Sequence, residues 1–457
     1  MVWYQELVID WTNDGRKIKQ CKSSVIRNTQ YYFKENISWS EISSGNISFR
    51  YNESKFIFDQ KGPCCFSSDR NNLYIICGFL NTKVAQFFLN ILCPTLDYSV
   101  GPVSCIPYAI TTDINIIELV KNNINNAKED WDSFETSWDF KQHPFICSVF
   151  TVTEAFNQWK TECDDRFNQL KANEEELNRI FIDIYGLQDE LTPEVEDKDI
   201  TVRKADLSRD IRSFVSYAIG CMFGRYSLDE EGLIYAGGEW DSSKYETFLP
   251  DDDNCIPITD EEYFSDDIVA RFIEFVKTVY GADTLEENLD FIANALGNKG
   301  DTSREVIRNY FLKDFYADHM KVYQKRPIYW LFDSGKQNGF KALIYMHHYD
   351  ADTVGRVRTD YLHRAQKYVE TAMQSAQYTI DNASSASEKS KATKAVTKYT
   401  KQLAEMKIYD EAIAHIANKR IEIEPDDGVK VNYEKFQGVE VAQEGKKSIQ
   451  VDLLAKI

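Results

Sequence analysis

The stretch KRPIYWLFDSGKQNGFKALIY, residues 325–345, decides the fold class of this chain of 457 residues. Its apolar and polar residues alternate around aromatic side chains, which predicts a pair of β-strands. Apolar residues at helical spacing precede it at 303–319 and follow it at 354–417, with an interruption at 382–387. Short strands between long helices indicate an α+β protein.

Residues 1–112 are predicted to form a mixed α/β domain of short strands and turns with one helix. Aromatic or β-branched runs bounded by Gly, Asn and Ser predict strands at 31–33, 47–51 and 55–58. Helical spacing predicts a helix at 73–92, and Gly101-Pro102 with Ile106-Pro107 marks a sharp end of the unit.

The rest of the chain is predicted to be mainly α-helical with short strand-rich segments. Amphipathic spacing predicts helices at 153–170, 173–184, 208–223 and 266–280, with Asn173 as a cap. Residues after Pro425 are predicted to form a strand-rich tail. The expected domains are 1–112, a helical connector at 113–230, a mixed α/β domain at 231–353, and a helical stretch with the tail at 354–457.

Composition indicates a folded cytoplasmic protein without a membrane crossing. The chain is 43% hydrophobic and 13% aromatic, which argues against disorder. The start, MVWYQELVID, has no signal-peptide pattern, and polar residues interrupt the most apolar stretch, 73–93. The 10 Cys residues contain no C-x-x-C pair, so we expect reduced, mostly buried thiols and no zinc site.

The net charge of −20 is unevenly divided. Residues 1–112 hold 11 Lys+Arg and 9 Asp+Glu, a charge of +2, so the remainder carries −22. Phosphate binding needs local basic groups and not a basic protein. The division permits DNA binding by the first segment, and the acidic remainder would repel DNA from its own surface.

The motifs of catalysis are missing from the sequence. No Asn-Pro or Asp-Pro dipeptide occurs, so the loop that holds the amino group in adenine methyltransferases is absent. The glycine-rich turns that bind nucleotides or S-adenosylmethionine are absent too. We therefore predict no catalytic, cofactor-binding or metal-binding residue. Gly220 and Gly224 are better explained by close packing at a helix contact than by phosphate binding.

Three other patterns have a chemical and a structural interpretation. Asp426, Glu444 and Lys446 fit a loose nuclease pattern, although a polar turn explains them more simply. The carboxylates around Trp131, Phe134 and Trp138 could bind a metal or serve as acid and base, but we predict an amphipathic helix with an aromatic face. These carboxylates are Asp130, Asp132, Glu135 and Asp139. His347 and His348 are predicted to lie on opposite faces of a strand, which excludes a joint metal site.

The N-terminal segment combines basic and aromatic residues in a pattern suited to DNA. A basic run follows the turn signal Asn13-Asp14-Gly15, and Arg27-Asn28 precedes a tyrosine-rich run. Arg and Asn can read guanine and adenine, whereas Lys and Tyr reach phosphates. The candidate DNA-binding residues are Arg16, Lys17, Lys19, Arg27, Asn28, Tyr31, Lys34, Trp39, Arg50 and Lys83. For any one of these residues, the alternative to DNA binding is a structural interpretation, in which the basic residues lie in a solvated loop and the aromatic residues in a buried strand.

Three blocks of this segment resemble the target-recognition domain of single-chain restriction–modification methyltransferases. They are RNTQYYFKENISW (27–39), FIFD (56–59) and GFLNTKV (78–84). Further blocks resemble the PglX methyltransferases of BREX antiviral defence systems. These are DWDSFETSWDF (130–140), NEEELNRIFIDIYGL (173–187), SYAIGCMFGRY (216–226), KRPIYWLFDSGK (325–336) and DDGVKVNY (426–433).

The resemblance implies site-specific DNA recognition linked to adenine-N6 methylation. In this family S-adenosylmethionine and the Asn-Pro-Pro-aromatic loop belong to an N-terminal domain, which this sequence lacks. The expected partners are double-stranded DNA, a methyltransferase domain in cis or in trans, and other BREX proteins. The alternative is a docking or regulatory module with little affinity for DNA.

Overall fold

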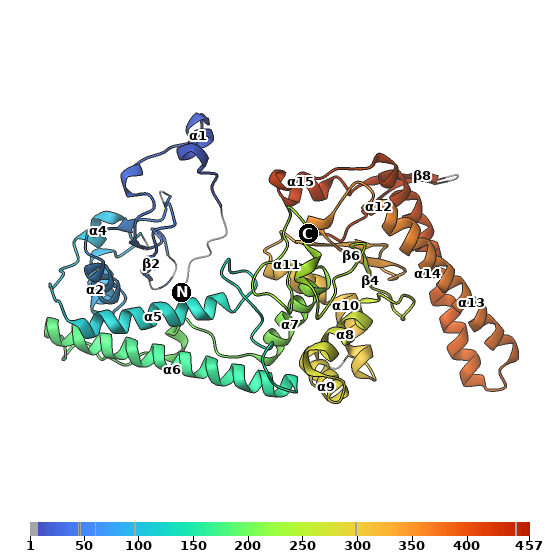
Figure 1. Cartoon of the computed structure of the whole chain (residues 1–457), viewed down its shortest axis with the longest axis horizontal. Helices are drawn as coiled ribbons and strands as arrows, with labels where there is room; N and C mark the ends of the chain where they lie inside the picture. The colour runs from blue at the N-terminus through green and yellow to red at the C-terminus, as the bar shows by residue number, and fades with distance from the viewer. Residues whose placement is uncertain are drawn as a thin grey trace. The chain divides into compact units, whose positions relative to one another are not determined.

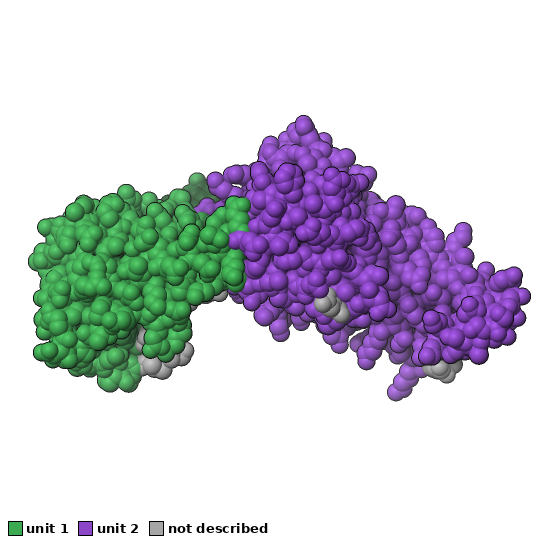
Figure 2. Space-filling view, turned by 90° about the horizontal axis from the view of Figure 1, so that it is seen from below, with its two compact units in different colours: residues 1–137, 158–205 green, residues 138–157, 206–457 purple. Residues whose placement is uncertain are grey.

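The computed structural model describes residues 8–43, 45, 47–59, 61–95, 97–297, 299–443 and 446–457. The chain divides into two compact units (Figure 2). The first comprises residues 1–137 with 158–205, and the second comprises 138–157 with 206–457. The first unit thus joins the predicted recognition domain to much of the predicted connector. The four-domain division stays a prediction.

The first unit packs a small antiparallel sheet and five helices around one core. The sheet has the order β2–β1–β3, and Ile37 pairs with Tyr51 and with Cys65. The strands are β1 (Asn36–Ser38), β2 (Arg50–Asn52) and β3 (Cys64–Cys65). The helices of the core are α2 (Arg70–Leu80), α3 (Lys83–Leu92), α4 (Val100–Ser104), α5 (Ile114–Asp132) and α6 (Val152–Tyr185).

The single helix predicted at 73–92 is wrong, because the chain bends by 71° between α2 and α3. Thr82 caps α3 by accepting from the Ala85 N–H, and the Asn81 amide donates to the carbonyl of Phe49. No single described helix is long and apolar enough to cross a membrane, and only this bent pair passes by length and composition. Many of its apolar residues, such as Phe79 and Leu89, are buried in the core, whereas Ile91 is 64% exposed.

The strands predicted at 31–33 and 55–58 are also wrong. Thr29–Tyr31 is a 3₁₀ turn, and 55–58 is irregular. Asn28 and Phe33 have φ values of 57°, which extended backbone excludes. The strand predicted at 47–51 is present only from Arg50.

The helices predicted at 153–170 and 173–184 are one continuous helix, α6. Asn173 is therefore not a cap. It is buried within the helix, and its amide donates to the side chains of Asn122 and Asn123 on α5, at 2.9 and 2.7 Å. A tertiary contact explains this polar residue.

The predicted aromatic helix face at 131–138 is wrong as well, because α5 ends at Asp132. Asp130 is buried and accepts from the Arg203 backbone N–H at 3.1 Å and from its Nε at 3.2 Å. The Arg203 guanidinium lies 3.5 Å from the centre of the Phe134 ring. The Asp130 carboxylate therefore forms a structural ion pair with Arg203.

The second unit contains the predicted pair of strands. β5 (Tyr329–Asp333) and β6 (Lys341–Tyr345) are antiparallel, with Leu331 opposite Leu343, and β4 (Ile256–Pro257) pairs with the other edge of β6. Helices surround this sheet (Figure 1). The α+β prediction is confirmed.

Both faces of the strand pair are covered. Trp330, Phe332, Ala342 and Ile344 belong to the core that α14 completes. Tyr329, from the alternate set, packs on the other side at 5.6 Å from Phe223 and 4.9 Å from His319. The alternation that identified the strands in the sequence therefore distributes side chains to two cores.

The helices of the second unit confirm most of the predicted ones. The interruption predicted at 382–387 separates α13 from α14. The single helix predicted at 303–319 is wrong, because Asp314 separates α10 from α11, and α9 was not predicted. The helices are α7 (Leu207–Met222), α8 (Ile268–Tyr280), α9 (Leu285–Leu296), α10 (Ser303–Lys313), α11 (Phe315–Val322), α12 (Thr353–Arg356), α13 (His363–Asn382), α14 (Ala386–Lys419) and α15 (Val429–Glu434). β7 (Val439–Gln443) and β8 (Lys446–Val451) confirm the strand-rich tail.

A buried ion pair fixes α8 against α10. Asp267 is 0% exposed, and its two carboxylate oxygens accept from both terminal nitrogens of Arg308 at 2.8 Å. The same carboxylate caps α8 through the Val269 N–H at 3.0 Å. Such a bidentate, hydrogen-bonded pair offsets much of the penalty of burying the charges.

Gly220 and Gly224 serve close packing, as predicted. A Cβ on Gly220 would lie 2.4 Å from the Tyr226 ring, and one on Gly224 would lie 2.4 Å from Trp240. Gly224 also has a φ of +69°, which favours glycine.

We predict that Gly220→Ala destabilises the second unit by about 1–3 kcal/mol, because Tyr226 must move out of its packed position. Gly355→Ala is the matched control, since nothing lies within 4 Å of its added Cβ in α12. The control should be neutral or slightly stabilising. Urea unfolding followed by tryptophan fluorescence measures both, and equal midpoints for the two variants would contradict the packing argument.

Candidate nucleic-acid interface

Six aromatic side chains of the first unit form a cluster near its N-terminal segment. The Trp11 and Tyr32 rings lie 5.3 Å apart, Tyr32 and Phe58 5.3 Å, and Phe58 and Phe66 5.6 Å. Tyr31 packs on Phe66 at 4.7 Å, and Phe33 lies 5.9 Å from Trp11. We call Trp11, Tyr31, Tyr32, Phe33, Phe58 and Phe66 the aromatic cluster.

Parts of the aromatic cluster face solvent. Tyr31 is 40% exposed and Phe33 is 41% exposed. Neighbouring exposed aromatic side chains of this kind mark a binding surface more often than isolated ones do. Flat rings with a polar handle suit stacking on bases and contact with phosphates.

A left-handed turn places the basic run beside this cluster. Asn13, Asp14 and Gly15, at the start of α1 (Thr12–Gln20), have φ values of 52°, 58° and 68°. A Cβ on Gly15 would lie 3.0 Å from the Trp11 indole, so the absence of a side chain permits this approach. The turn signal in the sequence is confirmed.

The same segment is basic. Residues 8–34 hold six Lys or Arg and two Asp, a charge of +4. Both carboxylates are paired, Asp10 with Lys17 at 3.0 Å and Asp14 with Lys19. The Lys19 ammonium also lies 5.7 Å from the centre of the Trp11 ring.

Hydrogen bonds keep these two carboxylates ionised. Those from Thr12 and then Lys17 lower the pKa of Asp10 to about 2, and the one from Lys19 lowers the pKa of Asp14. Exposed pairs of this type are weak, so phosphate oxygens can compete for the two lysines.

The remaining cations at the segment are available to a ligand. Arg16, Lys22 and Arg27 are exposed and form no ion pair with another described residue. The Lys34 ammonium lies 5.5 Å from the Tyr31 ring centre. Asn28 is exposed and stands in a left-handed conformation just before the 3₁₀ turn that carries Tyr31. Lys19 and Lys34 thus lie against rings of the aromatic cluster, and the other predicted residues between Arg16 and Lys34 belong to the same segment of the chain.

Three predicted residues lie elsewhere in the unit. Trp39 is 2% exposed, and its indole N–H donates to the Tyr98 carbonyl at 2.7 Å, so it is a core residue. Arg50 is half-buried in β2 opposite Ser38. Lys83 is half-buried at the start of α3.

Lys83 lies in an acidic environment. Its charge contributes to lowering the pKa values of Glu194 and Glu196, behind the hydrogen bonds that these carboxyl groups accept. Nearby carboxylates weaken the attraction of a lysine for a phosphate. Lys83 is therefore a weaker candidate than the basic residues of the segment 16–34.

The candidate residues from the sequence include Tyr31 but omit the other five members of the aromatic cluster, which are Trp11, Tyr32, Phe33, Phe58 and Phe66. Trp11 was detectable, because it stands two residues before the turn Asn13-Asp14-Gly15 and the basic run that follows it. Phe58 and Phe66 come from irregular chain, where no periodicity tells which side chains meet.

The patterns set aside as structural do not assemble a metal site. The described residues contain no group of three or more His, Cys, Asp or Glu that could hold a metal ion. His347 and His348 lie in the 3₁₀ turn Met346–His348, so the strand predicted there is wrong. Burial lowers both pKa values, that of His347 to about 4, and His348 stacks on Tyr235 at 4.3 Å.

The nuclease pattern is not assembled within the described chain. Asp426 lies in the 3₁₀ turn Pro425–Asp427, where its N–H donates to Glu424 at 3.3 Å. Glu444 and the side chain of Lys446 lie outside the described residues. The polar turn accounts for Asp426.

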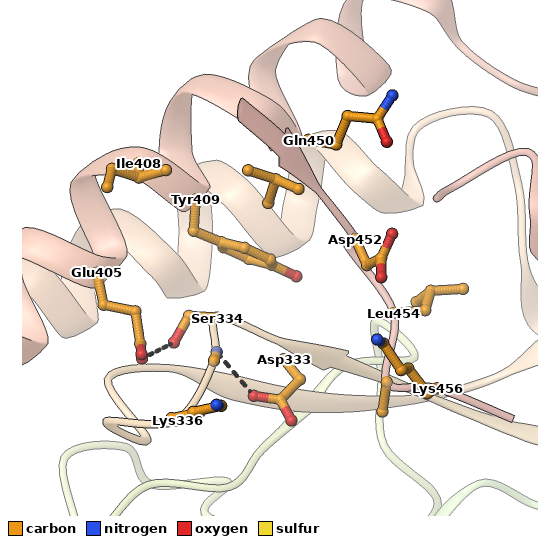
Figure 3. A pocket seen from close by; sticks show the side chains of 13 residues that line it. Asp333, Ser334, Lys336, Glu405, Ile408, Tyr409, Gln450, Asp452, Leu454 and Lys456 are labelled. Atoms are coloured by element: carbon orange, nitrogen blue, oxygen red, sulfur yellow. Dashed lines mark hydrogen bonds between the residues drawn. The ribbon is translucent and has the colours of Figure 1, made fainter. Parts of the chain in front are cut away.

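A polar pocket of about 520 Å³ in the second unit is lined in part by the turn between β5 and β6 (Figure 3). Glu405 of α14 accepts from the Ser334 hydroxyl at 2.9 Å and from the N–H groups of Gln337 and Gly339 at 2.8 and 3.2 Å. Asp333 accepts from Lys341 at 2.9 Å. The Glu405 carboxylate thus satisfies polar donors of the turn and holds the turn on α14.

The chain was compared with known proteins, and no protein-family model matches it. Over 95% of its length it is 48% identical to the adenine-specific methyltransferase PglX of Lacticaseibacillus casei (strain Zhang). It is 34% identical, again over 95% of its length, to the adenine-specific methyltransferase BrxX of Escherichia coli O9:H4 (strain HS). This chain is similar to part of an adenine-specific methyltransferase. It spans 37% of the first relative and 38% of the second, and the similarity to PglX confirms the resemblance seen in the sequence.

We predict that Trp39→Phe lowers the stability of the first unit by about 1–3 kcal/mol, because the Tyr98 carbonyl loses a buried donor. The salt dependence of duplex binding should stay unchanged. Thermal unfolding and a binding titration on the same sample measure the two effects. If the variant were stable but bound the duplex more weakly, Trp39 would have to be counted among the DNA-binding residues.

Proposed function

We propose that this chain is the DNA-recognition and DNA-clamping portion of an adenine-N6 DNA methyltransferase of the PglX type, acting in BREX antiviral defence. A methyltransferase domain, in cis or in trans, would bind S-adenosylmethionine and supply the catalytic loop. The complex would work in the cytoplasm with other BREX proteins. The supporting observation is the aromatic cluster with its basic segment, in a chain 48% identical to an adenine-specific methyltransferase.

Each group of this segment has a distinct role in the proposal. Arg27 and Asn28 carry the forked donors and acceptors that distinguish guanine and adenine at the edge of the major groove. Arg16, Lys22 and Lys34 contact phosphates and fix the register of the duplex. Most of the remaining surface is acidic, so repulsion limits the orientations in which DNA can approach.

A second candidate follows from that acidic remainder. The −22 charge of residues 113–457 suits docking to a basic protein surface. In that case the chain would be a regulatory module of the defence complex with little affinity for DNA. A titration of the whole chain with a duplex at low salt separates the two functions.

The first expected outcome is salt-dependent duplex binding that S-adenosylmethionine leaves unchanged. The slope of log affinity against log salt should correspond to several phosphates, at about 0.9 per phosphate contact. The absence of binding at 50 mM salt would favour the docking function. A change in the slope on adding S-adenosylmethionine would contradict the separation of recognition from cofactor binding.

The second expected outcome concerns Arg27→Gln with Lys34→Gln. Loss of the Lys34 phosphate contact should lower the slope by about 1, and the added loss of the Arg27 base contact should weaken affinity on the order of 10- to 100-fold at 0.1 M salt. The control is Lys121→Gln with Lys198→Gln, which removes the same charge from lysines paired with Glu118 and Glu196. Equal losses in the two double variants would mean that net charge, and not this surface, governs binding.

A further inference from the structure

The second unit carries a basic helical hairpin within an acidic surrounding. The hairpin comprises α13 and the first half of α14, which lie antiparallel (Figure 1). Residues 363–402 hold seven Lys or Arg and three Asp or Glu, a charge of +4. No acidic residue occurs on α14 between Glu388 and Glu405, although Asp and Glu number 73 in the chain.

The lysines of α14 are arranged in a row. Lys391, Lys394, Lys398 and Lys401 follow one another at intervals of three, four and three residues, which places them on one side of the helix. Ala392 and Tyr399 occupy a different side and are buried, and Tyr399 belongs to the hydrophobic core of the unit. The four lysines are exposed, and we call them the lysine row.

Among the described residues, a carboxylate partner is present for one member of the row. Lys398 pairs with Asp260 at 2.5 Å, near the point where Tyr399 donates to Glu261 at 3.3 Å. The other three lysines form no ion pair with any described residue. Positive charges without partners attract anions more strongly than paired ones.

The hairpin projects beyond its anchor. The Tyr263 and Tyr368 rings stack at 5.7 Å, and Gln402 donates to Asp260 at 2.9 Å. Residues 370–397, in contrast, hydrogen-bond only within the hairpin as far as the described chain extends. The row therefore runs from an anchored base onto a free arm.

We propose that the lysine row binds the phosphate backbone of a DNA duplex and acts as a second DNA contact in addition to the recognition surface of the first unit. The proposal rests on the proposed function and deepens it. From Lys391 to Lys401 the helix rises about 15 Å, the axial length of roughly four phosphates of one strand. Apart from Tyr399, the side chains between the lysines are Ala, Thr and Val, which permit close approach of the DNA backbone.

An acidic protein is a less suitable partner for this row. Protein interfaces depend on large aromatic, Arg or aliphatic side chains in desolvated pockets. The row offers lysines without such anchors. Lysine is a point charge that suits phosphate without reading sequence, so the contact would be independent of the recognised site.

The test uses the whole chain and a fluorescent duplex over a salt series. Replacing Lys391, Lys394 and Lys401 by Gln should lower the slope of log affinity against log salt by about 2–3 and weaken affinity on the order of 10- to 100-fold at 0.1 M salt. Gln preserves helix propensity, and thermal melting checks the fold. Replacing the same three lysines by Arg should retain both slope and affinity.

The control replaces Lys277, Lys313 and Lys321 by Gln, which removes the same charge from exposed positions outside the hairpin. It should change the slope by less than about 1. Normal duplex binding by the row variant would overturn this proposal and leave the proposed function standing. Failure of the unaltered chain to bind would overturn both. Lysine-dependent binding to fluorescent polyglutamate but not to the duplex would identify an acidic protein partner instead, and also overturns the proposal.

Discussion

The second unit depends on a pair of strands that is buried on both faces. β5 and β6 present alternate side chains to two different cores, so helices must cover each side of the sheet. α14 supplies part of one cover through Met406 and Tyr409, which are buried completely or almost so. The length of α14 exceeds what this cover requires. Its first half is consequently free to extend as an arm.

The turn between the strands strengthens this anchoring. Gly339 lies so close to α14 that a Cβ there would be 2.9 Å from Met406, and Glu405 accepts the donors of the turn. The carboxylate that satisfies these donors is the first acidic residue of α14 after Glu388. The first half of α14 thus carries the positive charge of the arm, and the second half packs near the sheet.

Charge separation links the fold to the proposed function. A chain with a net charge of −20 can bind DNA only where cations gather and carboxylates are absent or paired. The segment 8–34 meets this condition, since Asp10 and Asp14 are already bound to lysines. The hairpin meets it by excluding acidic residues from one stretch of helix. Elsewhere, basic side chains form structural ion pairs with carboxylates, as Arg203 does with Asp130.

The sequence predicted the parts that depend on local periodicity and failed where contacts between distant segments decide. Residues 325–345 were recognisable as strands, because alternation encodes two buried faces. The bend at Thr82 was missed because apolar spacing continues across it. Asn173 was mistaken for a cap because its partners on α5 lie about 50 residues away in the sequence. The basic half of the candidate site was visible in the sequence, but its aromatic neighbours Phe58 and Phe66 were not.

Lysine footprinting of the whole chain tests the central claim most directly. The chain is acetylated with and without a duplex at low salt, and each lysine is quantified by mass spectrometry. The account predicts protection of Lys22 and Lys34 in the first unit, while Lys198 and Lys277 react equally in both samples. Unchanged reactivity of Lys22 and Lys34 in a sample where the duplex is bound would contradict it, because DNA would then contact a different surface.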